Sequence, residues 1–306
     1  MILARELVKQ FGESCAVNGL SLRIPEGQFF GLLGPNGSGK TTTIHMLATL
    51  LAPTSGCISI AGLDTVTDPV QVRQKIGLVF QEPALDRTMT VEENLLFSGG
   101  LYGLSRQYCR ARIDGLLPLF ELQDRRQQKV GTLSGGMRRA VDLIRGVLHD
   151  PRVLFLDEPT AGLDLPSRNK MWRFVQDLIE DSGLTVVLTT HYLEEAAPCD
   201  QVCFIRDGMA IKSGAPGELV SSLGDRILEI ETARVDECLS VLDLTPGEFL
   251  VEGRAILVRT VDRTHAGMEK FQAVLADKAD TLRIRKPNLN DVFLWLSAGE
   301  RGTGSC

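Results

Sequence analysis

Gly34-Pro35-Asn36-Gly37-Ser38-Gly39-Lys40-Thr41-Thr42 fits the pattern G-x-x-x-x-G-K-[ST] in full, between an apolar run over Gln28–Leu33 and a helical pattern over Thr43–Leu51. Its glycines let the backbone curl until successive N–H groups point at a di- or triphosphate, and the following helix adds the positive end of its dipole. We expect Lys40 to reach the outer phosphates and Thr41 to ligate Mg²⁺. A glycine-rich turn that binds nothing needs neither Lys-Thr at this offset nor the flanking strand and helix. The stretch therefore predicts a phosphate-binding loop.

The composition is that of an ordinary soluble protein. The chain has 306 residues, of which 43% are hydrophobic and 24% charged, enough for a sizeable core and more typical of two domains than of one. No apolar run approaches the roughly 18 residues of a membrane span, and the amino terminus lacks a signal-peptide layout. We therefore expect a cytoplasmic protein. A net charge of −6 without a long basic run argues against nucleic acid as a partner.

The seven cysteines are scattered and odd in number. Cys199 and Cys203 have the spacing of a metal pair, but no second pair or suitably spaced His accompanies them. We expect reduced, mostly buried thiols.

Short apolar segments separated by glycine predict strands at Ile2–Val8, Leu20–Ile24 and Cys57–Ala61. Phe11 precedes Gly12 in the loop between the first two of these strands. An aromatic ring at that point could stack on a nucleotide base, because aromatic faces stack without needing a particular base. The alternative is that Phe11 belongs to the core.

The next segments combine one strand with a helical region. Lys75–Phe80 is strand-like and ends at Gln81, whose amide is well placed to face a ligand. From about residue 83 to 148 the apolar spacing becomes helical, with Thr90 able to cap the first helix and Gln107–Phe120 forming another. This part of the chain is predicted to be a helical insertion.

Two further patterns place polar groups beside the expected phosphate loop. Ser134, Gly135 and Gly136 precede an amphipathic helix over Arg138–Leu148 and could form an anion cradle, although such a triplet also caps helices that bind nothing. Val153–Glu158 consists of four apolar residues followed by two acids, as in a strand buried on both faces of a parallel sheet. Asp157 could hold Mg²⁺, and Glu158 could polarise an attacking water. Two acids on a solvated loop would be the alternative, which the phosphate loop disfavours.

The last pattern of this kind is a strand over Leu184–Thr190, which delivers His191 at its carboxyl end. It follows a turn over Ala161–Asp164 and a helix over Pro166–Glu180. Open α/β sheets place ligand groups at the carboxyl ends of their strands. We therefore expect His191 to contact a γ-phosphate rather than to be a merely packed side chain.

Taken in order and spacing, these motifs resemble those of ABC-transporter ATP-binding subunits. They are a Walker A motif (Gly34–Thr42), a Q-loop (Gln81), a signature (Leu133–Met137), a Walker B motif (Leu154–Glu158), a D-loop (Ala161–Asp164) and an H-loop (His191). The resemblance covers about residues 1–222 and is greatest to the exporter branch, which includes drug- and antibiotic-resistance ATPases and nodulation-factor export subunits. It implies an α/β P-loop NTPase (RecA-like) cassette with an antiparallel β subdomain and a helical subdomain.

The resemblance also implies a mechanism. Two copies would close head to tail around ATP and Mg²⁺ and drive export through a separate transmembrane permease, at the cytoplasmic face of the membrane. Phe11 and the loop Gly34–Thr42 would bind nucleotide; the partner copy would complete the site. The implied roles are catalytic for Glu158, His191 and Gln81, metal-binding for Thr41, Gln81 and Asp157, and nucleotide-binding in trans for Ser134, Gly135 and Gly136.

The sequence departs from the family pattern after the signature. Met137 is common in this branch but not in the wider family, and Ala140 stands where the family usually has Arg. Ile144-Arg145-Gly146-Val147 replaces the usual Ala-Arg-Ala-Leu. The phosphate-contacting positions remain, so we expect activity, and the departures concern the packing or tuning of the signature helix.

A soluble, non-transport ABC ATPase is the alternative function. Translation factors usually carry two cassettes in one chain, whereas this chain has one. Chromosome and repair ATPases interrupt the cassette with a coiled coil, and no sustained heptad run lies between Lys40 and Ser134. A nucleotide-binding regulator without hydrolysis would be expected to lack Glu158 or His191.

Residues 223–306 predict a small α+β accessory domain. Strands are expected over Arg226–Thr232, Phe249–Val251, Ala255–Thr260 and Thr281–Arg285, with helices over Val235–Leu242 and His265–Ala276. This β-α-β-β-α-β order is compatible with a ferredoxin-like domain. A last helix over Asn290–Leu296 resembles the terminal segment of the same exporter ATPases.

Overall fold

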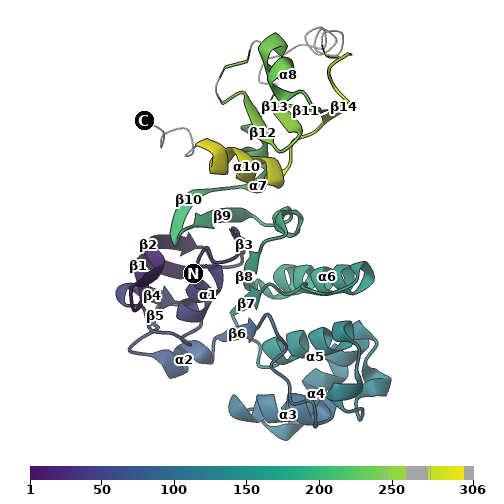
Figure 1. Cartoon of the computed structure of the whole chain (residues 1–306). Helices are drawn as coiled ribbons and strands as arrows, with labels where there is room; N and C mark the ends of the chain where they lie inside the picture. Colours follow the sequence, from purple (N-terminus) through teal and green to yellow (C-terminus); the bar gives the residue numbers. More distant parts are fainter. Residues whose placement is uncertain (243, 246, 260–274, 276, 300–306) are drawn as a thin grey trace. The chain divides into compact units, whose positions relative to one another are not determined.

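A computed structural model describes residues 1–242, 244–245, 247–259, 275 and 277–299 (Figure 1). The chain forms two compact units, the first over Met1–Tyr192 and Pro198–Ser213, the second over Leu193–Ala197 and the chain from Gly214 onward. Helix α7 (Pro216–Ser221) therefore belongs to the second unit, although the sequence analysis places it before the boundary at residue 222. The reason is that α7 packs against the terminal helix α10 (Leu289–Gly299).

A six-stranded sheet forms the centre of the first unit. Its order is β10 (Met209–Gly214), β9 (Gln201–Arg206), β3 (Phe29–Leu33), β8 (Thr185–Thr190), β7 (Val153–Asp157) and β6 (Ile76–Val79). The strands from β9 to β6 pair in parallel, so their carboxyl ends share one edge. Every residue of β3, β7 and β8 is buried, as expected for parallel strands covered on both faces.

A second sheet in this unit is antiparallel, with the order β2 (Ser14–Ile24), β1 (Ile2–Phe11), β4 (Ser55–Ile60) and β5 (Leu63–Asp64). Its strands β1 and β2 are longer than the sequence predicts. Phe11 pairs with Ser14, and Gly12 takes the turn at a φ of 58°. Phe11 is thus the last residue of a strand, and its placement in a loop was wrong.

Helices surround the sheets of the first unit. They are α1 (Lys40–Leu47), α2 (Pro69–Arg73), α3 (Val91–Leu101), α4 (Arg106–Leu116), α5 (Gly135–Val147) and α6 (Leu165–Ser182). Helices α3, α4 and α5 pack together and form the predicted helical insertion (Figure 1). Thr90 caps α3 in a capping box with Glu93, in which Glu93 N donates to Thr90 Oγ1 at 3.2 Å and Thr90 N donates to Glu93 Oε2 at 2.8 Å.

The second unit contains a four-stranded antiparallel sheet in the order β12 (Phe249–Glu252), β13 (Ala255–Arg259), β11 (Ile227–Glu231) and β14 (Thr281–Arg285). Helix α8 (Val235–Leu242) packs on it through Cys238 and Leu242, beside the buried Ile230 and Ile256. The described elements follow the predicted order. The predicted helix over 265–276 lies outside the described residues except for Leu275.

Two properties of the described residues bear on function. Cys199 and Cys203 are free, buried thiols, and burial raises the pKa of both, that of Cys203 to about 12. None of the described helices combines the length and the apolar character that crossing a membrane requires.

Candidate active site

The loop between β3 and α1 has the backbone that the sequence predicts. Gly37 and Gly39 take φ values of 81° and 102°, in the region that favours glycine. A Cβ at Gly39 would lie 2.4 Å from Ala16 O, and one at Gly34 would lie 2.1 Å from Ile205 O, whereas at Gly37 no atom among the residues that the structure describes lies within 4 Å of that position. Gly34 and Gly39 thus allow the loop to pack closely against neighbouring backbone, and Gly37 leaves the backbone of the loop accessible to a ligand.

Polar groups inside this loop suit a phosphate. Lys40 Nζ donates to Gly34 O and to Pro35 O, both at 2.9 Å. Burial lowers the pKa of Lys40, and two nearby carboxylates act in the opposite direction. Within the part of the chain that the structure describes, the buried Ser38 Oγ has no hydrogen-bond partner. A cationic Nζ and an unpartnered hydroxyl beside an open backbone fit an anionic ligand.

Hard oxygen donors gather beside the start of α1. Thr41 Oγ1 donates to Asp157 Oδ1 at 3.1 Å, and Thr189 Oγ1 donates to the same oxygen at 2.5 Å. Asp157 is the last residue of β7 and is buried. A hydroxyl and a carboxylate next to a phosphate loop are the donor types that Mg²⁺ prefers, since it is usually held by one or two carboxylates together with substrate phosphates.

Glu158 lies at the centre of a second polar cluster. Its side chain receives a hydrogen bond from Gln81 Nε2 to Oε2 at 3.2 Å, and His191 Nδ1 lies 3.1 Å from Oε1. These three residues follow β6, β7 and β8, whose parallel pairing brings their carboxyl ends together. Glu158 is only 9% exposed and has a φ of 44°, a conformation that non-glycine residues seldom adopt. Gln81 therefore holds the carboxylate by one hydrogen bond, the imidazole of His191 lies beside it, and the backbone is constrained.

Several of these groups border one cavity of about 560 Å³, whereas Asp157 lines a neighbouring one and His191 lines neither. It is lined by Phe11, Ala16, Asn36, Gly37, Gly39, Lys40, Thr41, Thr42, Gln81 and Glu158. Phe11 is 52% exposed, which excludes the core alternative, and Lys9 Nζ lies 5.2 Å from the centre of its ring. The structure thus brings the loop, Gln81, Glu158 and the aromatic ring to a single space.

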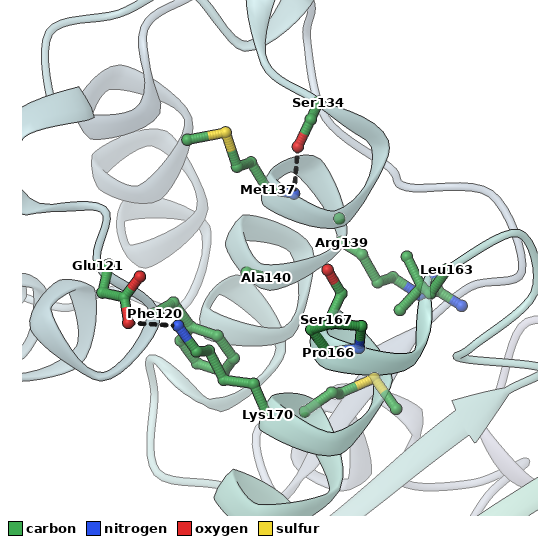
Figure 2. Close-up of a pocket in the computed structure, with 12 residues that line it drawn as sticks. Phe120, Glu121, Ser134, Met137, Arg139, Ala140, Leu163, Pro166, Ser167 and Lys170 are labelled. Atoms are coloured by element: carbon green, nitrogen blue, oxygen red, sulfur yellow. Dashed lines mark hydrogen bonds and ion pairs between the residues drawn. The ribbon is translucent and has the colours of Figure 1, made fainter.

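The Ser134–Gly136 triplet lies elsewhere in the chain. Ser134 Oγ accepts a hydrogen bond from Met137 N at 3.2 Å and caps α5, which begins at Gly135 rather than at the predicted Arg138 (Figure 2). Ser134 and Gly136 line a cavity of about 230 Å³, and Gly135 lines a neighbouring one. Within one chain, the structure does not bring this triplet to the cavity beside Lys40.

Comparison with known proteins identifies the family. Residues 17–161 match the ABC transporter family. The chain is 38% identical over 299 residues to the Nod factor export ATP-binding protein I of Burkholderia lata, covering 97% of this chain and 96% of that protein. This chain belongs to the ABC transporter family. The resemblance to ABC-transporter ATP-binding subunits that the motifs indicated is therefore confirmed.

Other relatives of the cassette agree with this result. The chain is 45% identical over 225 residues to the daunorubicin/doxorubicin resistance ATP-binding protein DrrA of Streptomyces peucetius (73% of this chain, 68% of that protein). Identity to the linearmycin resistance ATP-binding protein LnrL of Bacillus subtilis is 35% over 314 residues (97% and 98%). The dimeric structure of MJ0796, a bacterial ABC transporter cassette, superposes with a TM-score of 0.66 at 29% identity, covering 70% of this chain and 98% of that chain. The predicted α/β P-loop fold and ATPase class are confirmed.

One residue of this cassette escaped the sequence analysis. Arg139 of α5 is 4% exposed, and its guanidinium donates to the backbone carbonyls of Phe80, Glu158 and Pro159. The available signal was the spacing of Arg139, Asp142 and Arg145, which puts three charges on one face of a predicted amphipathic helix. Burial raises the pKa of the Asp142 carboxyl, against the pull of Arg145 and Arg139.

The family departure at Ala140 has a structural counterpart. Ala140 lines the 230 Å³ cavity between α5 and α6, together with Met137, Phe120, Pro166 and Lys170 (Figure 2). Lys170 Nζ forms an ion pair with Glu121 at 2.7 Å in the same place. The small side chain therefore leaves space beside the signature helix.

Proposed function

We propose that this cassette hydrolyses ATP at the cavity beside Lys40 and that hydrolysis drives export through a separate membrane permease. The single observation that supports the hydrolytic step is the arrangement around Glu158, which lines the same cavity as the phosphate loop, accepts a hydrogen bond from Gln81 and lies beside His191. Export is inferred from the relatives, whose names describe Nod factor export and resistance to antibiotics.

The nucleotide would lie along the loop Gly34–Thr42. Lys40 and the open backbone N–H groups would balance the charge of the phosphates, Ser38 Oγ would gain a partner, and the exposed ring of Phe11 would stack on the base. Thr41 and Asp157, together with the oxygen of the Gln81 side chain, would hold Mg²⁺. That ion would supply charge neutralisation at the β- and γ-phosphates.

Glu158 would orient and deprotonate the attacking water. A carboxylate suits this role when its position is fixed, because proton transfer in the transition state requires hydrogen-bond reach to the water. His191 would steady both Glu158 and the γ-phosphate. Gln81 would change its contacts when Mg²⁺ and the γ-phosphate bind, and this change would displace the segment that follows it. Electrostatic stabilisation in a shielded site would supply most of the rate enhancement.

Ser134, Gly135 and Gly136 would act on the nucleotide of a second copy. In this chain they are separated from the cavity beside Lys40, and Ser134 and Gly135 are exposed at the amino terminus of α5. A head-to-tail dimer would bring them to the partner's phosphates, where the positive end of the α5 dipole stabilises negative charge. Self-association of a related cassette supports this arrangement.

Residues 1–222 would form the cassette, and residues 223–306 would form an accessory domain with an assembly or regulatory role. The cassette would attach peripherally to the membrane through the permease. The segment from residue 82 to 100 is the proposed contact, since it follows Gln81 directly. Val91 and Leu95 are fully buried and pack the insertion, whereas Phe97 is 60% exposed.

The test requires co-expression of this chain with its membrane permease. Changing Leu85 and Met89, both half-buried near the Q-loop, to Asp should weaken co-purification with the permease and abolish transport while sparing ATPase activity of the isolated chain. Val66→Asp with Val70→Asp, which alters two exposed apolar residues of the same unit, is the matched control and should leave co-purification intact. Unchanged transport in the Leu85/Met89 variant, with expression confirmed, would place the coupling surface elsewhere.

A further inference from the structure

Helix α5 carries three charges on a face that is turned into the protein. Arg139 and Asp142 are buried, and Arg145 is largely covered. Buried charges are expensive to desolvate unless they are paired and hydrogen-bonded. Arg145 Nε donates to Asp142 Oδ1 at 2.8 Å, while Arg139 Nη1 lies 3.7 Å from Asp142 Oδ2. The two arginines therefore share one carboxylate, and each has donors left over for other groups.

Those remaining donors reach different places. Arg145 Nη2 donates to Leu78 O, inside β6, at 2.8 Å, and Leu78 does not line the cavity beside Lys40. Arg139 instead binds the ends of two strands at once, since it donates to Phe80 O, directly before Gln81, and to Glu158 O at 3.0 Å and Pro159 O. One guanidinium thus spans the backbone on either side of the Gln81–Glu158 contact.

The backbone of Glu158 needs such support. Its φ of 44° lies in a region that non-glycine residues seldom adopt and that persists only where surrounding groups fix it. Glu158 N donates to Thr189 O at 3.0 Å, which holds the amide side of the residue. Arg139 holds the carbonyl side. Together these bonds fix the backbone from which the carboxylate projects.

Arg139 is also close to the amino terminus of α5. It lies five residues after Ser134, about one and a half helical turns along a rigid element. Gly136 packs against α6 so tightly that a Cβ there would meet Ser167 Oγ at 2.6 Å. A displacement of the helix start would therefore be passed to Arg139 rather than absorbed between the two.

We propose that Arg139 is a positioning residue, which fixes the orientation of Glu158 and Gln81 and transmits movement of the signature end of α5 to the hydrolytic site of its own chain. This inference rests on the proposed roles of Glu158 and of the Ser134–Gly136 triplet. In the proposed head-to-tail dimer, the amino terminus of α5 contacts the nucleotide of the partner, while Arg139 of the same helix contacts the hydrolytic site of its own chain. Binding of one nucleotide would therefore affect hydrolysis of the other.

The experiment compares Arg139→Gln, Arg139→Lys and Arg145→Gln in the full chain. Both glutamine variants remove a guanidinium that contacts Asp142 and a carbonyl of the β6 segment, so both should lower the melting temperature. Steady-state ATP turnover with Mg²⁺ gives kcat and KM, and a fluorescent ATP analogue gives the dissociation constant. For Arg139→Gln we expect kcat to fall about tenfold or more, a part of the 10²–10⁴ that a positioned general base contributes, with KM little changed.

Arg145→Gln should retain kcat within about twofold, and Arg139→Lys should recover part of the loss because an ammonium still donates to these carbonyls. Equal loss of kcat in Arg145→Gln and Arg139→Gln, or a change in KM alone, would show that Arg139 has only a structural role. If Arg139→Gln does not fold, Arg139→Lys decides, and wild-type kcat in that variant overturns the proposal. An unsubstituted chain without turnover would instead overturn the proposed function itself.

Discussion

The six-stranded sheet of the first unit and the four-stranded sheet of the second unit are built from strands of similar length, but among the described residues only the first gathers candidate functional side chains at one edge. In the first, the parallel pairing of β6, β7 and β8 puts Gln81, Glu158 and His191 at one edge. In the second, every pairing is antiparallel, so each edge mixes the starts and the ends of strands. Charged residues at such an edge, Arg254 and Asp280, simply pair with each other at 2.9 Å.

The difference shows how topology concentrates chemistry. The carboxyl ends of parallel strands place loops with free polar groups around one crevice, whereas an antiparallel sheet distributes its turns over both ends. Substitutions at the edge of the first sheet should therefore change catalysis, and comparable substitutions in the second should change stability only.

The largest effect is expected for Glu158→Gln. The amide keeps the shape of the side chain but cannot accept a proton, so ATP turnover should fall about 100-fold or more while nucleotide binding persists. An ATP-bound dimer should accumulate, which size-exclusion chromatography with and without ATP would detect. Normal hydrolysis by this variant would remove Glu158 from the catalytic role.

A pair of glycines gives the next largest contrast. Gly39 and Gly253 both have positive φ, 102° and 60°, but a Cβ at Gly39 would lie 2.4 Å from Ala16 O, whereas no atom of the described residues lies within 4 Å of that position at Gly253. Gly39→Ala must shift the phosphate loop and should weaken nucleotide binding about tenfold or more, since a displacement of even 1 Å in such a site is costly. Gly253→Ala should cost about 1 kcal/mol of stability and leave binding unchanged.

Titration with a fluorescent ATP analogue, with urea unfolding as the second measurement, separates these effects. Equal loss of stability with equal binding in the two variants would mean that the loop backbone tolerates a side chain. The phosphate loop would then respond to substitution as the hairpin of the second unit does, and the expected difference between the two sheets would be absent there.

Deleting residues 225–306 tests whether the site depends on the second unit. Every residue that lines the 560 Å³ cavity belongs to the first unit, so nucleotide binding should remain measurable. The deletion removes α10, against which η4 (Leu193–Ala196) and α7 pack, and uncovers the buried Leu193 and Leu219. We therefore expect a lower melting temperature and more aggregation. A truncated chain that folds, as judged by circular dichroism, but does not bind ATP would show that the boundary at residue 222 is wrong.

In the first unit, the sequence predicts the strands of the parallel sheet and the motifs at their ends, but not the side-chain contacts between those motifs. The strand, loop and helix around Lys40 follow from spacing alone, and the strand ends that carry Glu158 and His191 follow from apolar runs of fixed length. The hydrogen bond from Gln81 to Glu158 does not, because it depends on side-chain directions that tertiary packing sets. The burial of Arg139 could not be predicted either, since it depends on which face of α5 meets β6 and β7.

In the second unit the elements were predictable but their partners were not. The hairpin around Gly253 follows from two strand-like segments that flank a Glu-Gly turn. The order of strands in the sheet requires long-range pairing, which a local pattern does not contain. The same is true of Arg285, which links β14 to α10 through Asp291.

The smallest effect is expected on the free energy of unfolding, when two Arg–Asp pairs of the second unit that differ in burial are each disrupted. Arg285 Nη1 and Nη2 donate to the two oxygens of the buried Asp291, each at 2.7 Å, whereas Arg254 and Asp280 pair while exposed to solvent. Asp291→Asn removes the charge of a bidentate pair and should lower the free energy of unfolding by about 1–3 kcal/mol. Asp280→Asn should have no measurable effect, because solvent screens an exposed pair. Urea unfolding of both variants measures the difference, and ATP turnover should stay at the wild-type rate in each. A loss of turnover in Asp291→Asn without loss of folding would show that the second unit acts on the site directly, and the separation of chemistry from stability between the two sheets would not hold.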